Sequence, residues 1–260
     1  MIHFFPSREI AVSIGGFGIH WYGLMYMLAF VVALYLTPRL QKYRSLDISK
    51  DTLTTIITWA IGGVIIGGRL GYVFFYEFSY FIENPLDIFA VWSGGMSSHG
   101  GFIGVSLALF YILRKNHIPI VPFLDIATVP IALGLSLGRV GNFINLELYG
   151  VVTSLPWGIE IPGVEGLRHP TQIYAVVKDL SIAFLCFALL TNKRVKPGIV
   201  FSVFLILYAV LRSVIEIFRV QAHPEIDILG LVLTRGQFLS LPILLVGFIL
   251  LMYSRYRESS

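Results

Sequence analysis

The stretch FLDIATVPIALGLSLGRVGNFINLELYG, residues Phe123–Gly150, joins a long apolar run to a polar ending. The run Phe123–Phe143 can cross a bilayer, since about 20 residues of helix span the hydrocarbon core. Arg139 and Asn142 stand at its end, and Glu147 follows shortly after. A charge at hydrocarbon depth costs at least about 2.5 kcal/mol, so it persists where it pairs, binds or catalyses. The stretch therefore predicts a transmembrane helix with a functional site at one end.

Composition extends this prediction to the whole chain. The mean hydropathy is +0.80, and 56% of the 260 residues are hydrophobic while only 13% are charged. Soluble domains carry about 25% charged residues, so that class is excluded. We expect an all-α integral membrane protein, a single transmembrane domain over residues 1–260, with seven transmembrane helices. The apolar runs lie at about 21–36, 53–75, 102–113, 123–143, 173–190, 199–218 and 238–253.

The net charge of +4 is distributed as cytoplasmic-loop charge. Eleven of the 19 lysines and arginines fall in three gaps between the runs and in the C-terminal tail. Under the positive-inside rule these segments are cytoplasmic, so the N-terminus is outside and the C-terminus inside. The sequence contains no basic patch of the kind that binds nucleic acid, so no nucleic-acid partner is expected. The longest outside loop, 144–171, is expected to form a small periplasmic cap. The first 20 residues are expected to lie on the membrane as an interfacial element.

One face of the run 199–218 is polar. Tyr208, Arg212, Glu216 and Arg219 fall within an arc of roughly 80° at 100° per residue. Glu216 is spaced to pair with either arginine. Such a pair can simply fix helix packing, or the surplus positive charge can bind an anion, of which phospholipid phosphate is the abundant one in a membrane.

Arginine suits a phosphate because its planar fork donates two parallel hydrogen bonds and stays charged. Arg139 supplies a second intramembrane cation, with Asn142 on the same helix face. Arg69 is either a third phosphate ligand or a structural residue that snorkels or pairs with Glu77.

The segment Gly94–Gly101, GGMSSHGG, surrounds His99 with glycines and serines. This composition favours a bent, closely packed backbone. Histidine exchanges a proton near neutral pH, so His99 is either a general base or a packed hydrogen-bonding residue. No partner at metal-ligand spacing accompanies it, and no Gly-x-Ser-x-Gly elbow occurs, so neither a metal site nor a serine hydrolase is indicated.

Three separated blocks resemble the bacterial prolipoprotein diacylglyceryl transferases. They are HWYGLMY at 20–26, GGMSSHGG at 94–101 and GRVGNFINLELYG at 138–150. The sequence RHPTQ at 168–172 and the Tyr208–Arg219 segment add to the resemblance, which covers nearly the whole chain. Two departures are visible: the loop after Gly150 is short, and Ser98 stands where the family pattern favours an aromatic residue.

The resemblance implies a multi-pass enzyme of the bacterial inner membrane. It would transfer the diacylglyceryl group of phosphatidylglycerol to the lipobox cysteine of prolipoproteins, forming a thioether and releasing glycerol phosphate. No metal or other cofactor is implied. The catalytic positions it implies are His99, Arg139 and Arg212. The substrate-binding positions it implies are Tyr22, Asn142, Glu147, Gly150, Tyr208, Glu216 and Arg219. A transporter or a lipid-binding protein with a phosphate-coordinating arginine pair is the alternative.

Overall fold

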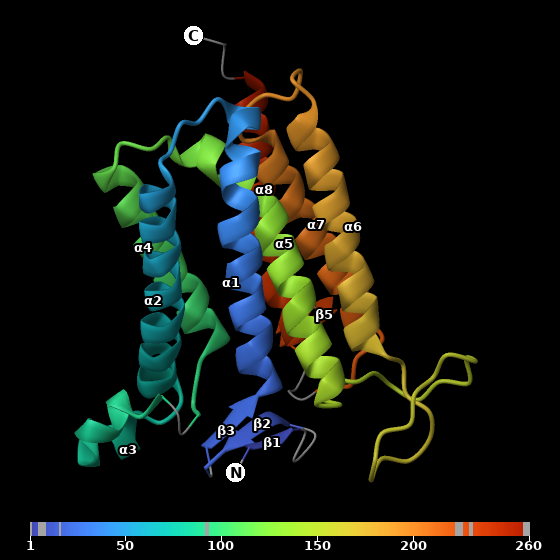
Figure 1. The fold of residues 1–260 in the computed structure, drawn as a ribbon. Coiled ribbons are helices and arrows are strands. Elements are labelled where there is room, and N and C mark those ends of the chain that lie inside the picture. Colours follow the sequence, from blue (N-terminus) through green and yellow to red (C-terminus); the bar gives the residue numbers. More distant parts are fainter. Residues whose placement is uncertain are drawn as a thin grey trace. The chain divides into compact units, whose positions relative to one another are not determined.

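The computed structural model describes residues 2–4, 9–15, 17–91, 94–221, 226–228 and 231–256, and long helices dominate it (Figure 1). The helices are α1 (Trp21–Leu40), α2 (Lys50–Phe75), α3 (Phe78–Glu83), α4 (Ser98–Lys115), α5 (Ile120–Ile144), α6 (Thr171–Thr191), α7 (Ile199–Glu216) and α8 (Arg235–Tyr256). Two 3₁₀ helices are η1 (Gln41–Arg44) and η2 (Pro85–Phe89). The strands are β1 (Ile2–Phe4), β2 (Ile10–Ile14), β3 (Phe17–His20), β4 (Ile226–Ile228) and β5 (Leu231–Leu233).

Six helices in the described part of the chain are long and apolar enough to cross a membrane. They are α1 continued by η1, α2, α5, α6, α7 and α8. The third expected run corresponds to α4, whose apolar middle lies between the polar start Ser98-His99 and the basic end Arg114-Lys115. The chain is thus a multi-pass helical membrane protein, while the seventh span and the orientation of the termini stay predictions.

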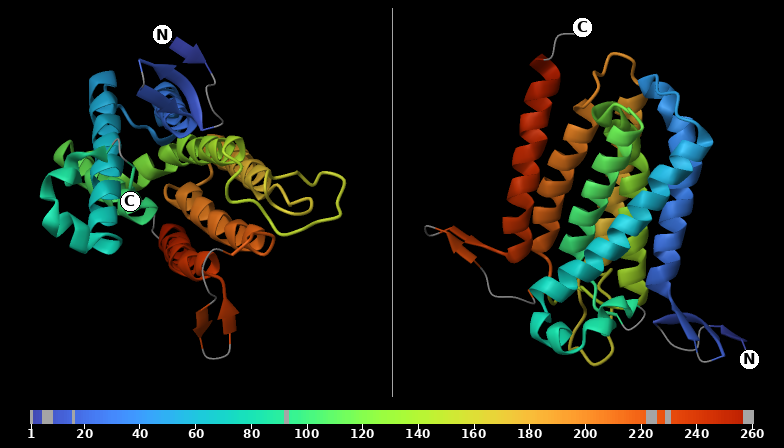
Figure 2. Two further views of the ribbon diagram at one scale, coloured as in Figure 1. Left: turned by 90° about the horizontal axis from the view of Figure 1, so that it is seen from below. Right: turned by 90° about the vertical axis from the view of Figure 1, so that its left-hand side faces the viewer.

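Two small antiparallel sheets depart from the all-α expectation. Strands β1, β2 and β3 form one sheet, and β4 pairs with β5 in the other. The apolar residues Ile10, Val12 and Ile14 alternate with smaller ones in β2, which is the period of a strand. The N-terminal segment expected to be interfacial therefore contains a sheet. The β4–β5 hairpin extends away from the start of α8 (Figure 2, right).

The chain divides into two compact units: unit 1 is Met1–Arg44 with Leu124–Ser260, and unit 2 is Ser45–Phe123. Within unit 2, α2 packs on α4 through glycines. A Cβ on Gly67 would lie 2.7 Å from the Gly104 Cα, and one on Gly71 would lie 2.7 Å from the Gly100 Cα. The absence of side chains lets the two backbones approach, as is common between helices in lipid.

Arg69, in the same unit, is a structural residue. Its guanidinium donates to the carbonyl oxygens of Asp87 at 2.5 Å, Gly94 at 2.6 Å, Ile88 at 2.9 Å and Gly95 at 3.0 Å. The side chain is buried and its guanidinium carbon lies 5.1 Å from the centre of the Phe81 ring. The loop after α3 therefore binds Arg69 in place of the Glu77 pairing that we considered, and four of its five N–H groups are used.

Within unit 1, Asp125 holds α7 in place near the start of α5. Its carboxylate is fully buried and accepts from the Gly198 N–H at 2.8 Å, the Phe201 N–H at 2.9 Å and Arg44 Nε at 2.7 Å. A carboxylate at a helix N-terminus satisfies the free N–H groups and complements the helix dipole. Asp125 thereby caps α7 from another helix. Helix α7 then packs between α6 and α8 (Figure 2, left).

Candidate active site

The polar end of α5 forms a chain of hydrogen bonds. Arg139 Nη1 donates to Asn142 Oδ1 at 3.2 Å, and Asn142 Nδ2 donates to Glu147 Oε1 at 3.0 Å. The backbone N–H of Glu147 also donates a hydrogen bond to the Asn142 carbonyl at 3.1 Å. Asn142 is buried, so it links the arginine and the carboxylate within the protein interior.

The turn that carries Glu147 is conformationally strained. Leu146 and Leu148 have φ angles of 55° and 58°, a left-handed conformation that costs a residue with a Cβ about 1–2 kcal/mol. Two side chains of α6 hold the turn: Gln172 Nε2 donates to the Glu147 carbonyl and Thr171 Oγ1 to the Leu148 carbonyl, both at 2.7 Å. Strain of this kind is retained where the surroundings enforce it, typically at functional sites.

Tyr22 brings α1 to the same group. Its hydroxyl is a hydrogen-bond partner of the Glu147 carboxylate and interacts electrostatically with Arg139. Its ring packs against the α5 backbone, 3.7 Å from where a Cβ on Gly141 would be. The predicted residues Tyr22, Arg139, Asn142 and Glu147 are therefore in one place, although the first is more than a hundred positions away in sequence.

Gly150 lies where three backbone segments meet. Its N–H donates to the His169 carbonyl at 2.8 Å, and it pairs with Arg219 in an isolated antiparallel bridge. A Cβ here would be 2.5 Å from both the His169 Cβ and the Phe218 oxygen. Only glycine fits, so the sequence signature ends on a residue that joins the cap to the end of α7.

The second polar group lies at the end of α7. Glu216 forms ion pairs with Arg212, one turn earlier, and with Arg219 Nη1 at 3.6 Å. The expected pairing of Glu216 is confirmed in both directions. The Glu216 carboxylate also abuts Gly236 in the first turn of α8, where a Cβ would be 2.6 Å from its carboxyl carbon. That turn starts with a capping box in which the Thr234 and Gln237 side chains each accept the other's backbone N–H.

Three arginines, Arg139, Arg212 and Arg219, are close enough to repel one another, and we call them the arginine cluster. The side chains of Arg212 and Arg219 are only 19% and 20% exposed. Burial lowers the pKa of the Arg219 guanidinium. The Glu216 carboxylate acts in the opposite direction and raises this pKa, while the positive charges of Arg212 and Arg139 lower it further. An arginine nevertheless keeps its charge in proteins. Glu216 is shared by two of the three cations, so the cluster favours an anion.

Tyr208 packs against Lys178, which forms an ion pair with Asp179, and neither charged residue was a predicted site residue. Lys178 Nζ on α6 lies 4.2 Å from the centre of the Tyr208 ring and 2.6 Å from Asp179 Oδ1. Lys178 also interacts electrostatically with Arg139 and Arg212. These two residues can be noticed in the sequence, because adjacent charges interrupt the apolar run 173–190. The sequence does not show which way their side chains point within a helix bundle.

His99 lies in the first turn of α4 in unit 2, and its side chain is exposed. Ser97 caps this helix by accepting the Gly100 N–H at 3.2 Å, and its own N–H donates to the Gly68 carbonyl at 2.8 Å. Gly94 and Gly95, with φ angles of 84° and 74°, make the preceding bend. The bent, glycine-rich backbone expected here is present, and the role of His99 stays a prediction.

His169 lies in unit 1 and is buried by aromatic rings. Its Nδ1 is 3.0 Å from the Tyr174 hydroxyl, which accepts the Trp157 indole N–H at 2.8 Å. Since indole only donates, the tyrosine hydrogen is available for a hydrogen bond to Nδ1. Phe218 packs on the same imidazole. These contacts support a structural role.

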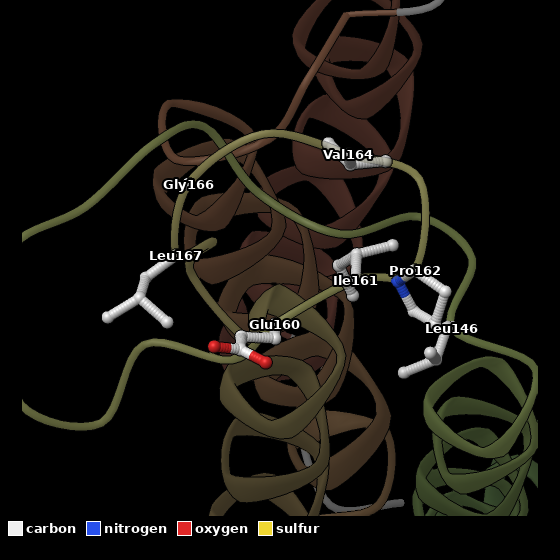
Figure 3. A pocket seen from close by; sticks show the side chains of 7 residues that line it. All are labelled: Leu146, Glu160, Ile161, Pro162, Val164, Gly166 and Leu167. Carbon is white, nitrogen blue, oxygen red and sulfur yellow. The ribbon is translucent and has the colours of Figure 1, made fainter.

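The cap contains an open hollow of about 510 Å³, bordered by the loop that Figure 3 shows. Its lining holds one charged residue, Glu160, and no cation, so it does not suit a phosphate. Backbone bonds between Ile159 and Arg168 and between Thr153 and Leu167 hold the loop. Among the described residues, no three His, Cys, Asp or Glu side chains gather as a metal site. The lining residues are Leu146, Glu160, Ile161, Pro162, Val164, Gly166 and Leu167.

Membrane-crossing helices that hold a partly buried, incompletely neutralised arginine cluster define a multi-pass membrane protein whose site can accept an anionic ligand. A family model described as prolipoprotein diacylglyceryl transferase matches residues 9–253, and the chain belongs to this family.

Several relatives are named phosphatidylglycerol–prolipoprotein diacylglyceryl transferase. The protein from Geobacter sulfurreducens is 41% identical over 94% of this chain and 94% of its own length. The Nitrosospira multiformis protein is 41% identical over 96% of this chain and 87% of its own. The Glaesserella parasuis protein is 38% identical over 98% and 96%.

Proposed function

We propose that this protein transfers the diacylglyceryl group of phosphatidylglycerol to a cysteine thiol of prolipoproteins. Family membership over nearly the whole chain supports this activity. The observation that carries the mechanism is the arginine cluster, three partly buried cations, two of which share the Glu216 carboxylate. The transporter and lipid-binding alternatives gain no support from the relatives, which are named as transferases.

In the proposed reaction, the cysteine sulfur attacks the glyceryl carbon that carries the phosphate ester. A carbon–sulfur bond forms while the carbon–oxygen bond breaks, and its electron pair stays on the oxygen of the departing glycerol phosphate. The thiol proton passes to a base, since the thiolate is the nucleophile. The nucleophile belongs to the substrate, so the enzyme needs no reactive cysteine.

Arg139 and Arg212 are proposed to bind the phosphate and to stabilise the charge that builds on it. Arginines held in place before the reaction supply such stabilisation without reorganisation. Asn142 and Glu147 orient Arg139 through their hydrogen bonds. Glu216 orients Arg212 and Arg219, while Tyr22 and Gly150 maintain the turn at Glu147. His99 is proposed as the base on the strength of its sequence context alone.

We also propose seven transmembrane helices in the bacterial inner membrane, with a periplasmic N-terminus and a cytoplasmic C-terminus. Residues 1–260 would act as one catalytic domain, with 144–171 as its periplasmic cap. Reporter fusions after Lys115 and after Arg194 are expected to be cytoplasmic, and fusions within 153–166 periplasmic. A periplasmic reporter signal after Lys115 would overturn this topology.

The activity is tested with purified protein in phosphatidylglycerol micelles and a peptide that carries a lipobox cysteine. We expect the peptide mass to increase by one diacylglyceryl group, with release of an equal amount of glycerol phosphate. A micelle has no compartments, so a transporter would give no product. Binding of phosphatidylglycerol without formation of a thioether would support the alternative that the protein only binds lipid.

A further inference from the structure

A buried lysine–aspartate pair on α6 lies beside the proposed phosphate site. Lys178 is 6% exposed and Asp179 is 1% exposed. Their charged atoms are 2.6 Å apart. Both residues are in a helix that can cross a membrane, where an ionised side chain costs at least about 2.5 kcal/mol and marks a ligand pathway or a site. The mechanism proposed above makes no use of either residue.

The donor nearest to the Asp179 carboxylate is its ion-pair partner, the Lys178 ammonium, 2.6 Å from Oδ1. Neither of its oxygens accepts a hydrogen bond from the described residues, and the Lys178 ammonium nitrogen likewise makes none of adequate geometry. The large majority of buried polar atoms have a partner, and each exception calls for an explanation. Two buried carboxylate oxygens that accept no hydrogen bond of good geometry are suited to a ligand that brings two hydroxyl donors.

The pair belongs to the polar cluster that contains the arginines. Asp179 interacts electrostatically with Arg139 and Arg212, and Lys178 lies over the ring of Tyr208, one turn before Arg212 on α7. A ligand that places its phosphate against the arginines thus presents its adjoining groups to α6.

Charge balance supports a phosphodiester ligand. The arginine cluster and Lys178 contribute four positive charges, and Glu147, Asp179 and Glu216 contribute three negative ones. The difference of 4 − 3 leaves one positive charge, which the single negative charge of a phosphodiester neutralises. The rest of the head group is therefore expected to be uncharged, as glycerol is.

We propose that Asp179, held by Lys178, accepts hydrogen bonds from the two free hydroxyls of the phosphatidylglycerol head group and so selects this lipid. The proposal rests on the proposed function. A site built around substrate hydroxyls rejects analogues that lack them, because its buried polar groups are then left unpaired. Asp179 is a specificity residue in this view, while the arginines bind the phosphate.

The test compares transfer from phosphatidylglycerol with transfer from phosphatidylethanol, which keeps the phosphodiester and lacks both hydroxyls. The unaltered protein should prefer phosphatidylglycerol by at least about tenfold in kcat/KM. Asp179→Asn should reduce this preference by about tenfold, through loss with phosphatidylglycerol and little change with phosphatidylethanol. Asp125→Asn removes a buried carboxylate near the opposite end of α5 from Arg139 and should leave the preference unchanged, whatever it does to total activity.

A second variant guards against misfolding. Lys178→Leu with Asp179→Leu replaces the buried pair by apolar side chains, a change that is often neutral or stabilising. It should keep the thermal unfolding midpoint and lose the preference. An unchanged preference in both variants, or equal losses with both lipids, would overturn the assignment. Failure of the unaltered protein to modify the peptide from phosphatidylglycerol would instead overturn the proposed function.

Discussion

Arg69 and Arg212 both lie in helices that can span a membrane, but they are neutralised differently. Arg69 donates to four backbone carbonyls and touches an aromatic ring. Among the described residues, Arg212 donates a hydrogen bond only to Glu216, a carboxylate that it shares with Arg219. A cation with most of its donors used fixes a loop, whereas one with most of its donors to spare can bind a ligand. The number of satisfied donors, more than burial, separates the two roles.

The units that contain these arginines differ in the same way. In unit 2, α2 and α4 pack through glycine backbones. In unit 1, polar side chains of α1, α5 and α6 converge on the turn after α5, and Glu216 joins α7 to the segment that follows it. Glycine packing gives a rigid pair of helices with few reactive groups. Polar packing gives a cluster that can bind and orient a charged substrate.

The largest expected effect tests whether unit 2 also contributes chemistry. His99→Gln should lower the transfer rate by roughly 10²–10⁴-fold, the usual range for loss of a general base. Raising the pH should partly restore the rate, because the peptide thiol, with a pKa near 8.5, then ionises unaided. Rates are measured from pH 6 to 9 with the lipobox peptide. A large defect that stays constant to pH 9 would show that His99 positions substrate or supports the turn.

Substitution by lysine distinguishes the arginines proposed to bind phosphate from the structural Arg69. Arg139→Lys and Arg212→Lys keep the charge and lose the planar fork, so each should lose roughly 10²–10³-fold in kcat, as for loss of an oxyanion donor. Arg69→Lys is the matched control: it should lower the thermal unfolding midpoint and leave folded protein with kcat within a few-fold of normal. Near-normal transfer by both Arg139→Lys and Arg212→Lys would show that these two arginines do not bind the phosphate as proposed.

Glu216 tests whether the cluster needs charge or only position. Glu216→Ala strands Arg212 and Arg219, and breaking a buried pair typically costs about 3–5 kcal/mol. Glu216→Gln keeps an oxygen acceptor and should impair both stability and transfer less. Thermal unfolding in detergent and peptide modification are measured on the same preparations. Equal and complete loss of activity in two well-folded variants would indicate that Glu216 itself transfers a proton.

The smallest effect concerns the glycine-packed pair. Gly67→Ala places a Cβ against the α4 backbone and should destabilise the protein by about 1–3 kcal/mol, the usual cost of overpacking. Gly62→Ala, on the same helix, meets nothing within 4 Å and should be neutral or slightly stabilising, since alanine is the better helix former. Similar unfolding midpoints for the two variants would show that the close packing of α2 and α4 contributes little.

Much of the site was predictable because helix periodicity is local. The spacing of Arg212, Glu216 and Arg219 places them on one face whatever surrounds the helix, and the ion pairs are present. Arg139 and Asn142 likewise required only a three-residue spacing. The partners of Arg69 were not predictable, because they are backbone carbonyls of a loop, and a carbonyl has no signature in the sequence.

The sequence by itself determined that the chain is a multi-pass helical membrane protein, which family it belongs to, and where its intramembrane charges lie along each helix. These properties follow from composition and from the 3.6-residue period, which act over a few turns. The tertiary structure alone decided that Tyr22 joins Glu147, that Gly150 meets His169 and Phe218, and that Lys178 lies over Tyr208. These contacts connect distant segments, and the rotation and depth of each helix depend on how all its neighbours pack.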